Sequence, residues 1–338
     1  MPEPLIKLDG ASQVFKSKRG DVPAVNDVSF EVNPGEVLCL VGESGCGKTT
    51  SARMAAGLNK PTDGTVSFRG RDIWGMDKAD FTNFRRSVQY VHQDPYASLN
   101  PIRSINKTLT APLLKHKIAK NSGHALELAA GLLERVDLHP AESYLYKFPH
   151  QLSGGQRQRV AIARALSLDP KLIVADESTS MLDVSIRVGM LNMLGRLRDD
   201  LEVGFLFITH DLAIAKYFGW SGKIAVMYLG RIVEFGPTPD VINNPQHPYT
   251  RALLAAVPEP DPELSKTRVP DGGLRSAEIP SLRRLPTGCT FHPRCPRFEA
   301  GTCDTTEPQL VPIEPRRQVS CHIVAREHTA LDRASGHA

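Results

Sequence analysis

The sequence lacks any long hydrophobic run. None of its apolar stretches approaches the roughly 20 residues that a membrane-spanning helix needs, which argues against a transmembrane chain. No internal repeat is present either. Residues 1–9 lack the basic-then-apolar order of a signal peptide, so we expect the protein to stay in the cytosol.

The net charge is also small. The 338 residues carry a formal charge of +4 at pH 7, which neither demands nor forbids a nucleic-acid partner. With 41% hydrophobic and 23% charged residues, the composition is that of a globular protein and excludes disorder of the whole chain. The length exceeds that of one ordinary domain, so we expect a core with an appendage.

Short apolar runs alternate with helical patterns along much of the chain, which is typical of a parallel sheet covered on both faces. Before this region, residues 5–32 alternate apolar and polar positions and predict a strand-rich start. Helical periodicity from 105 to about 152 predicts a helical insertion. The fold class is therefore α/β. The runs that we expect to be strands are residues 37–41, 64–68, 88–91, 172–175, 205–209 and 224–228.

Regular structure is expected to break near Pro258. Seven Pro and Gly residues between positions 258 and 280 interrupt any helix or strand there. We therefore divide the chain into a core, residues 1–257, and a linker with a C-terminal extension, residues 258–338. The closing residues 326–338 are polar, and we expect them to be frayed.

A glycine-rich loop lies between the strand at 37–41 and a helix expected at 49–58. It reads G-E-S-G-C-G-K-T and fits the pattern G-x-x-x-x-G-K-[ST] in the required strand-loop-helix context. Glycines let successive backbone N–H groups point at phosphate oxygens, and the start of the helix adds its positive dipole end. The candidate nucleotide-binding residues are Gly42, Glu43, Ser44, Gly45, Cys46, Gly47, Lys48, Thr49 and Thr50.

Two side chains of this loop carry chemistry. We expect Lys48 to reach the terminal phosphates and the Thr49 hydroxyl to bind Mg²⁺. Cys46 occupies a variable position whose backbone does the binding. The alternative is a chance glycine-rich turn, and the flanking strand and helix argue against it.

The strand at 172–175 ends in two acidic residues. Asp176 and Glu177 then lie at the carboxyl end of a strand, where ligands bind in α/β sheets. We expect Asp176 to hold Mg²⁺ through water and Glu177 to orient or deprotonate an attacking water molecule. Such a pair alone is more often a solvated loop. Together with the phosphate loop it predicts a nucleotide hydrolase, and the lack of an N-K-x-D guanine motif favours ATP over GTP.

The segment 152–166 reads L-S-G-G-Q-R-Q-R-V-A-I-A-R-A-L, which resembles the signature of ATP-binding cassette ATPases. Ser153 can cap the helix that follows, and Gly154 and Gly155 let backbone N–H groups approach a phosphate. A plain helix cap is the alternative. In the family, two subunits face each other, and each ATP lies between the phosphate loop of one and the signature, here Ser153 to Gln156, of the other.

The resemblance assigns further residues by position. Gln93 resembles the glutamine that senses Mg²⁺ and links to the helical part, Asp183 the aspartate that bridges the dimer, and His210 the histidine that contacts the γ-phosphate. Phe15 is the candidate for stacking on adenine, with a role in the core as the alternative. The implied fold is a P-loop cassette with a RecA-like parallel core, an N-terminal antiparallel β subdomain and a helical subdomain at about 94–155.

A closer resemblance is to the ATPase subunits of oligopeptide and dipeptide importers, over nearly the whole chain. It rests on the segments D-P-Y-A-S-L-N-P (94–101), N-P-Q-H-P-Y-T-R-A-L-L (244–254) and G-C-T-F-H-P-R-C-P (288–296). Ser178 and Met181 depart from it, because the family usually has Pro and Ala there. Several members of this branch import oligosaccharides, so the solute stays open between peptide and oligosaccharide.

The importer resemblance also implies partners and a location. It implies two permease subunits, a second and related ATPase in a heterodimer, and an extracytoplasmic solute-binding protein, with no nucleic acid. The protein would sit at the cytoplasmic face of the membrane. The rival is a soluble cassette ATPase that acts on nucleic acid or ribosomes. Such proteins usually carry tandem cassettes or a long coiled coil, and the sequence shows neither.

Four of the six cysteines crowd into the last fifth of the chain. Gaps of five, seven and seventeen residues separate Cys289, Cys295, Cys303 and Cys321. Four thiolates so spaced can wrap one site, and a reducing cytosol favours metal over disulfides. C-x-x-C zinc knuckles are lacking, although His292 and His322 could join a zinc site. Because the importer family includes members with a [4Fe-4S] cluster here, we prefer iron-sulfur at 289–321, with zinc and free thiols or disulfides as alternatives.

Overall fold

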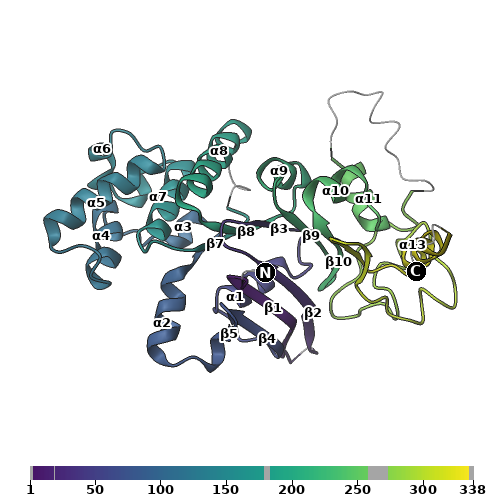
Figure 1. The fold of residues 1–338 in the computed structure, drawn as a ribbon. Helices are drawn as coiled ribbons and strands as arrows, with labels where there is room; N and C mark the ends of the chain where they lie inside the picture. The colour runs from purple at the N-terminus through teal and green to yellow at the C-terminus, as the bar shows by residue number, and fades with distance from the viewer. Residues whose placement is uncertain (1–2, 19, 179–182, 258–272, 335–338) are drawn as a thin grey trace.

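The computed structural model describes residues 3–18, 20–178, 183–257 and 273–334. Two β-sheets and a lobe of helices make up the fold (Figure 1). Met181 and the segment 258–272, which holds most of the predicted linker, lie outside the described residues.

An eight-stranded sheet runs through the centre of the molecule in the order β11-β12-β10-β9-β3-β8-β7-β6 (Figure 1). The five strands from β9 to β6 are parallel, and β10, β12 and β11 continue the sheet in antiparallel pairs. The strands are β3 (Val37–Val41), β6 (Val88–Val91), β7 (Leu172–Asp176), β8 (Gly204–Thr209), β9 (Lys223–Tyr228), β10 (Arg231–Pro237), β11 (Val311–Glu314) and β12 (Arg317–Val319). The predicted parallel sheet is confirmed.

Burial on both faces explains the apolar runs of the central strands. Every residue of β3, β7 and β8 is buried, and successive side chains enter opposite cores because side chains alternate along a strand. Cys39 and Val41 of β3 join one core, while Leu38 and Leu40 join the other. The first core lies under α8 (Val184–Leu201), α9 (Leu212–Phe218), α10 (Thr238–Asn243) and α11 (Pro248–Ala255).

The second core lies between the central sheet and a smaller antiparallel sheet of order β2-β1-β4-β5, with α1 (Lys48–Ala55) between the two (Figure 1). The predicted strand-rich start is thus confirmed as a β subdomain. Its strands are β1 (Ile6–Phe15), β2 (Val22–Val32), β4 (Asp63–Phe68) and β5 (Arg71–Asp72). The helix α2 (Lys78–Ser87), which the sequence analysis does not predict, is capped by Asp77.

The helical insertion forms a lobe at one end of the central sheet (Figure 1). It consists of α3 (Pro95–Ser98), α4 (Ile105–Lys115), α5 (Ser122–Arg135), α6 (Glu142–Leu145) and α7 (Gly154–Leu166). Ser104, Asn121 and Ser153 cap α4, α5 and α7 through their side-chain oxygens. Because α7 starts at the signature and leads to β7, the signature is placed where the lobe rejoins the core.

The C-terminal extension adds its strands to the edge of the core sheet. β12 pairs with β10 through Glu234 opposite Val319 and Phe235 opposite Gln318, and β11 pairs with β12. The chain then forms α13 (His322–Ala334). Our expectation of frayed residues is therefore wrong for 326–334, since α13 begins on apolar residues that pack on β12. Ile323 and Val324 are buried there.

A buried ion pair fastens β12 to the core. Glu234 of β10 has no exposed surface, and it accepts hydrogen bonds from the backbone N–H groups of Gln246 and His247, both at 2.9 Å. Arg317 of β12 donates to the same carboxylate at 3.1 Å and to the carbonyl of Asn244 at 2.7 Å. Removing one partner leaves the other charge buried without its counter-charge.

We predict that Arg317→Ala lowers the free energy of unfolding by about 3–5 kcal/mol, measured by urea denaturation, because Glu234 then lacks its cation. The matched control is Arg231→Ala. Arg231 pairs with the partly exposed Glu307, so its loss should cost about 0–1 kcal/mol. Equal, small effects of the two substitutions would contradict the assignment.

Candidate nucleotide-binding site

The phosphate loop joins the end of β3 to the start of α1. Gly47 is the N-cap of α1 with φ +107°, and an added Cβ would lie 2.4 Å from the carbonyl oxygen of Ala24. Only glycine fits this backbone. Gly42 is equally confined, because a Cβ there would lie 2.2 Å from the carbonyl oxygen of Met227. The glycines of the pattern are thus required by close backbone packing.

Lys48 is held inside this loop. Its side chain is buried, and Nζ donates to the carbonyl oxygens of Gly42 at 2.7 Å and Glu43 at 3.0 Å. A buried ammonium held by neutral carbonyl groups is a strong site for an anion. The loop therefore presents a fixed positive charge beside the N-terminus of α1.

A cavity of about 190 Å³ lies at this loop. It combines the loop with Gln93, from the segment after β6, and Glu177, from the segment after β7. The sequence predictions name each lining residue except Ala24. The lining consists of Ala24, Ser44, Gly45, Gly47, Lys48, Thr49, Thr50, Gln93 and Glu177. Residues far apart in the chain thus meet at the carboxyl edge of the parallel strands, as such sheets require.

Asp176 connects the loop to β7. One carboxylate oxygen accepts from the Thr49 hydroxyl at 3.0 Å and the other from the Tyr90 hydroxyl at 2.6 Å. Burial and the charge of Glu177 raise the pKa of Asp176, while these two hydrogen bonds oppose the rise. Thr49 and Asp176, both predicted to hold Mg²⁺, are therefore brought together. Tyr90 is a site residue that the sequence analysis misses.

The site also brings together Glu177, predicted to act on water, Gln93, predicted to sense Mg²⁺, and His210, predicted to contact the γ-phosphate. Glu177 accepts from the side-chain amide of Gln93 at 2.8 Å, and its other carboxylate oxygen lies 3.4 Å from Nδ1 of His210. Glu177 has φ +42°, a conformation that is costly for any residue with a side chain. Its backbone N–H bonds to the carbonyl of Ile208 at 3.0 Å. The next strand thus holds the turn that presents this carboxylate.

The signature forms a separate part of the site. Ser153 Oγ accepts from the N–H of Gln156 at 3.2 Å, and Gln156 Oε1 accepts from the N–H of Ser153 at 3.0 Å, which is a capping box. Nothing lies within 4 Å of the position a Cβ would take on Gly154, so the start of α7 is open. None of the residues from Ser153 to Gln156 lines the 190 Å³ cavity.

Other predicted site residues are also absent from the lining of that cavity, namely Gly42, Glu43, Cys46, Asp176, His210, Asp183 and Phe15. Asp183 is exposed at the start of α8 and makes no side-chain capping bond. Phe15 ends β1 with 42% of its surface exposed. An exposed aromatic side chain is available for stacking, and the adenine contact of Phe15 stays a prediction.

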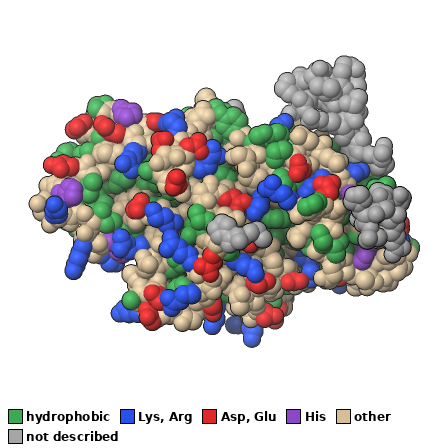
Figure 2. Space-filling view, viewed as in Figure 1, with side chains coloured by type: hydrophobic (Ala, Val, Ile, Leu, Met, Phe, Trp, Pro, Cys, Tyr) green, Lys and Arg blue, Asp and Glu red, His purple; other side chains and the backbone are tan. Residues whose placement is uncertain are grey.

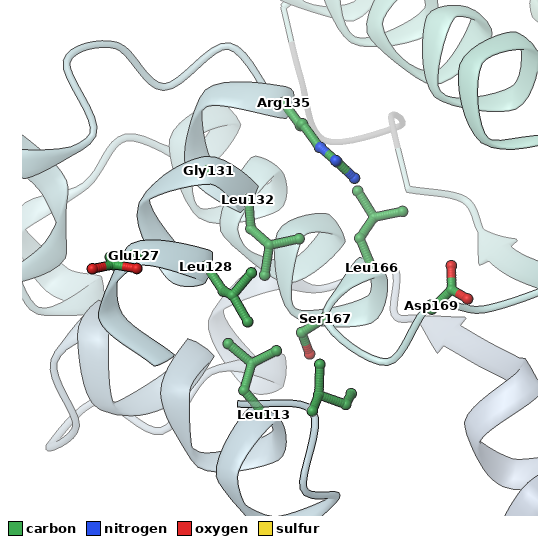
Figure 3. Close-up of a pocket in the computed structure, with 10 residues that line it drawn as sticks. Leu113, Glu127, Leu128, Gly131, Leu132, Arg135, Leu166, Ser167 and Asp169 are labelled. Carbon is green, nitrogen blue, oxygen red and sulfur yellow. The ribbon is translucent and has the colours of Figure 1, made fainter. Parts of the chain in front are cut away.

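A second cavity, of about 250 Å³, lies inside the helical lobe between α4, α5 and the end of α7 (Figure 3). Leu113, Leu128, Leu132 and Leu166 point into it, whereas Glu127 points away (Figure 3). This lining offers neither a glycine loop nor a lysine for phosphate. The smaller cavity, at the phosphate loop, has the groups that suit a nucleotide.

The four clustered cysteines converge in space. The N–H of Cys289 donates to the carbonyl of Cys303 at 2.8 Å, and burial, together with charge on the three neighbouring thiols, raises the pKa of Cys289 to about 12. Within the described ranges, however, no group of three or more His, Cys, Asp or Glu side chains is arranged to hold a metal ion. The fold gathers the thiols without building a ready metal site from them.

The fold and the site define a class of protein. A parallel sheet with a glycine loop, a buried aspartate bonded to the loop threonine, and a glutamate beside Gln93 and His210 form an ATP-binding cassette ATPase. A model of the ABC transporter family matches residues 25–180, and a model described as the oligopeptide/dipeptide transporter C-terminal region matches residues 233–303. The chain belongs to the ATP-binding proteins of ABC transporters, in their oligopeptide/dipeptide branch.

Similar proteins agree with this assignment. A probable peptide ABC transporter ATP-binding protein of Sinorhizobium fredii, y4tS, is 46% identical over 92% of this chain and 85% of its own. A putative oligopeptide transport ATP-binding protein of Bacillus subtilis, YkfD, is 42% identical over 96% of this chain and 97% of its own. Among solved structures, a dimeric post-hydrolysis state of the ATP-binding cassette MJ0796, bound to ADP and Pi, has a TM-score of 0.62 and 28% identity. It covers 69% of this chain and 98% of that chain.

The chain is thus a transporter ATPase by family. None of the helices in the described ranges has the length and apolar content that a membrane span needs.

We predict that Gly47→Ala reduces ATP affinity by about tenfold or more, because the new Cβ would have to push the loop away from Ala24. Binding is measured by calorimetry with ATP and Mg²⁺. The control is Gly131→Ala in α5, where nothing lies within 4 Å of the added Cβ, and it should bind ATP normally. Unchanged affinity in Gly47→Ala would contradict the role of this backbone.

Proposed function

We propose that the chain powers peptide import by hydrolysing ATP in the cavity between the phosphate loop, Gln93 and Glu177. The observation that carries the proposal is the contact of Glu177 with both Gln93 and His210, on the rim of the cavity that holds Lys48. A carboxylate so placed can orient or deprotonate a water molecule. Catalysis would otherwise consist of positioning and charge stabilisation.

Each residue then has a role in hydrolysis. Lys48 neutralises the terminal phosphates, and the loop N–H groups from Ser44 to Thr50 hold the remaining oxygens. Mg²⁺, bound through Thr49, Gln93 and Asp176, would neutralise further phosphate charge. The chemistry of these donors fits, because two hard oxygen ligands already face each other at 3.0 Å. His210 would contact the γ-phosphate, and it lies beside Glu177.

We propose that the site is completed by a second, related ATPase subunit in a heterodimer. The signature, Ser153 to Gln156, lies outside the cavity of its own chain and presents the open start of α7. The positive dipole end of a helix attracts the phosphates of an ATP held by a facing loop. Asp183 would bridge the two subunits.

The transported solute is proposed to be a peptide. Support comes from the relatives, whose names describe peptide or oligopeptide transport. The remaining partners would be two transmembrane permeases and an extracytoplasmic solute-binding protein, which place the ATPase at the cytoplasmic face of the membrane. Charges of both signs are interspersed on the face shown in Figure 2, unlike the basic field of a nucleic-acid clamp. The cassette would span residues 1–257, with the extension at 258–338.

We further propose that Cys289, Cys295, Cys303 and Cys321 bind a [4Fe-4S] cluster, with zinc as the alternative. Their ligand type, spacing and convergence support the proposal. A single zinc ion needs every sulfur within about 2.3 Å of one point, and the described side chains do not form such a group. No step of ATP hydrolysis is assigned to this site.

We predict that Glu177→Gln lowers the rate of ATP hydrolysis by about 10²-fold or more while ATP still binds, because only the group that acts on water is lost. Phosphate release and ATP binding are measured on the assembled transporter. The control Glu134→Gln, on the exposed side of α5, should hydrolyse ATP normally. A Glu177→Gln variant with full hydrolysis would remove Glu177 from the mechanism.

The metal proposal predicts a broad absorption band near ~400 nm and about four irons per chain after anaerobic purification. Cys295→Ser should lose both, whereas Cys46→Ser, in the phosphate loop, should keep them. Iron, sulfide and zinc are quantified together. Stoichiometric zinc without iron, or no metal at all, would overturn the iron-sulfur assignment and leave the ATPase assignment intact.

A further inference from the structure

Glu43 occupies a position of the phosphate loop where the pattern allows any residue, yet its side chain is firmly held. Arg294, 251 residues away in the extension, donates to its two carboxylate oxygens at 2.8 Å and 3.0 Å. The Arg294 side chain is 6% exposed and that of Glu43 23%. Two parallel bonds between a guanidinium and a carboxylate fix orientation as well as distance.

The backbone of Glu43 is held by the same part of the molecule. Its N–H donates to the hydroxyl of Tyr249 in α11 at 2.9 Å. The Tyr249 ring packs against Tyr228, with ring centres 4.6 Å apart, and against Phe291 of the extension, at 5.4 Å. Arg294 itself lies over the Phe291 ring at 5.8 Å. Both the main chain and the side chain of this loop residue therefore rest on an aromatic cluster.

The held residue is directly connected to the phosphate-binding groups. The carbonyl of Glu43 accepts from Nζ of Lys48 at 3.0 Å, and the next residue, Ser44, lines the nucleotide cavity. A shift of Glu43 would therefore move Lys48 and Ser44. A free carboxylate here would also repel phosphate, because like charges at short range are costly in a partly buried site.

We propose that Arg294 and Glu43 are a positioning pair that sets the shape and charge of the phosphate loop and so ties ATP affinity to the C-terminal extension. The inference rests on the proposed ATP site at residues 42–50. Arg294 does not touch ATP; it acts through Glu43. Because Arg294 directly precedes Cys295, the pair joins the loop to the cysteine-rich region, and a change in the packing of that region reaches the nucleotide through this contact.

The test is a double-mutant cycle on the purified full-length chain, with ATP and Mg²⁺ binding measured by calorimetry. Arg294→Met should weaken ATP binding by about tenfold or more, because the partly buried Glu43 carboxylate is left without its cation. Adding Glu43→Gln to Arg294→Met should restore most of the affinity, because the unpaired charge is gone. Loss of binding that Glu43→Gln does not restore would overturn the proposal, since it would show only general damage to the extension.

Two further variants separate the possible failures. Arg297→Met removes a more exposed ion pair inside the extension, that with Glu327, and it should leave ATP affinity unchanged. A loss equal to that of Arg294→Met would overturn the pair's specific role. Lys48→Ala should abolish binding, and if it does not, the proposed ATP site fails and the inference with it. If Lys48→Ala loses ATP but Arg294→Met binds normally, only the inference fails. In hydrolysis assays, Arg294→Met should raise KM and leave kcat within about twofold.

Discussion

The charge of a nucleoside triphosphate, held out of bulk water at one edge of a sheet, is the constraint on which the rest of the structure depends. The negative oxygens of the phosphates need fixed positive partners. In a low-dielectric site, the free-energy cost of a missing partner is larger than in water. The fold meets this with buried Lys48 and the start of α1 at one strand end, and with Asp176, whose carboxylate would hold Mg²⁺, at another. The parallel central sheet brings these strand ends together, and the cores on its two faces keep them in place.

The same edge of the sheet holds two strained backbone conformations and a site that its own chain leaves incomplete. Glu177 is held at a positive φ by its bond to β8, while Gly47 adopts a backbone that a side chain would prevent. The surrounding sheet must stabilise both. The open start of α7 lies apart from the cavity of its own chain. In the proposed dimer, ATP held by one subunit would contact the open start of α7 of the other subunit. This contact would close the two subunits, and closure can gate transport.

Local sequence rules account for most of the core and the site. The bounds predicted for β3 and β6 match the structure, and the glycine loop, the acidic pair, Gln93 and His210 meet where the chemistry requires. These signals are local, since each depends on a strand end and the few residues after it. The resemblance to a known family supplied the signature and the importer branch, which composition and periodicity alone would not have given.

The features that were missed are those set by distant pairing. Tyr90 looks like any strand residue until β6 lies beside β7 and its hydroxyl meets Asp176. The strands β11 and β12 have four and three residues, and their place at the sheet edge follows from the pairing of β12 with β10 across some eighty residues. Arg294 and Glu43 are in contact across most of the chain, and no pattern in either segment points to the other. Turns, strands and caps can be predicted from residues that are neighbours in the sequence, whereas ion pairs between distant segments cannot.

The most direct test of the composite ATP site is vanadate-dependent photocleavage of the ATPase in the assembled transporter with Mg²⁺ and ATP. Vanadate trapped in place of the γ-phosphate cuts the backbone groups that touch it. The account predicts fragments from cuts at two places, the loop Gly42 to Thr49 and the signature Ser153 to Gln156. Cleavage at the loop without cleavage at the signature, or at neither, would contradict a site built from two facing subunits.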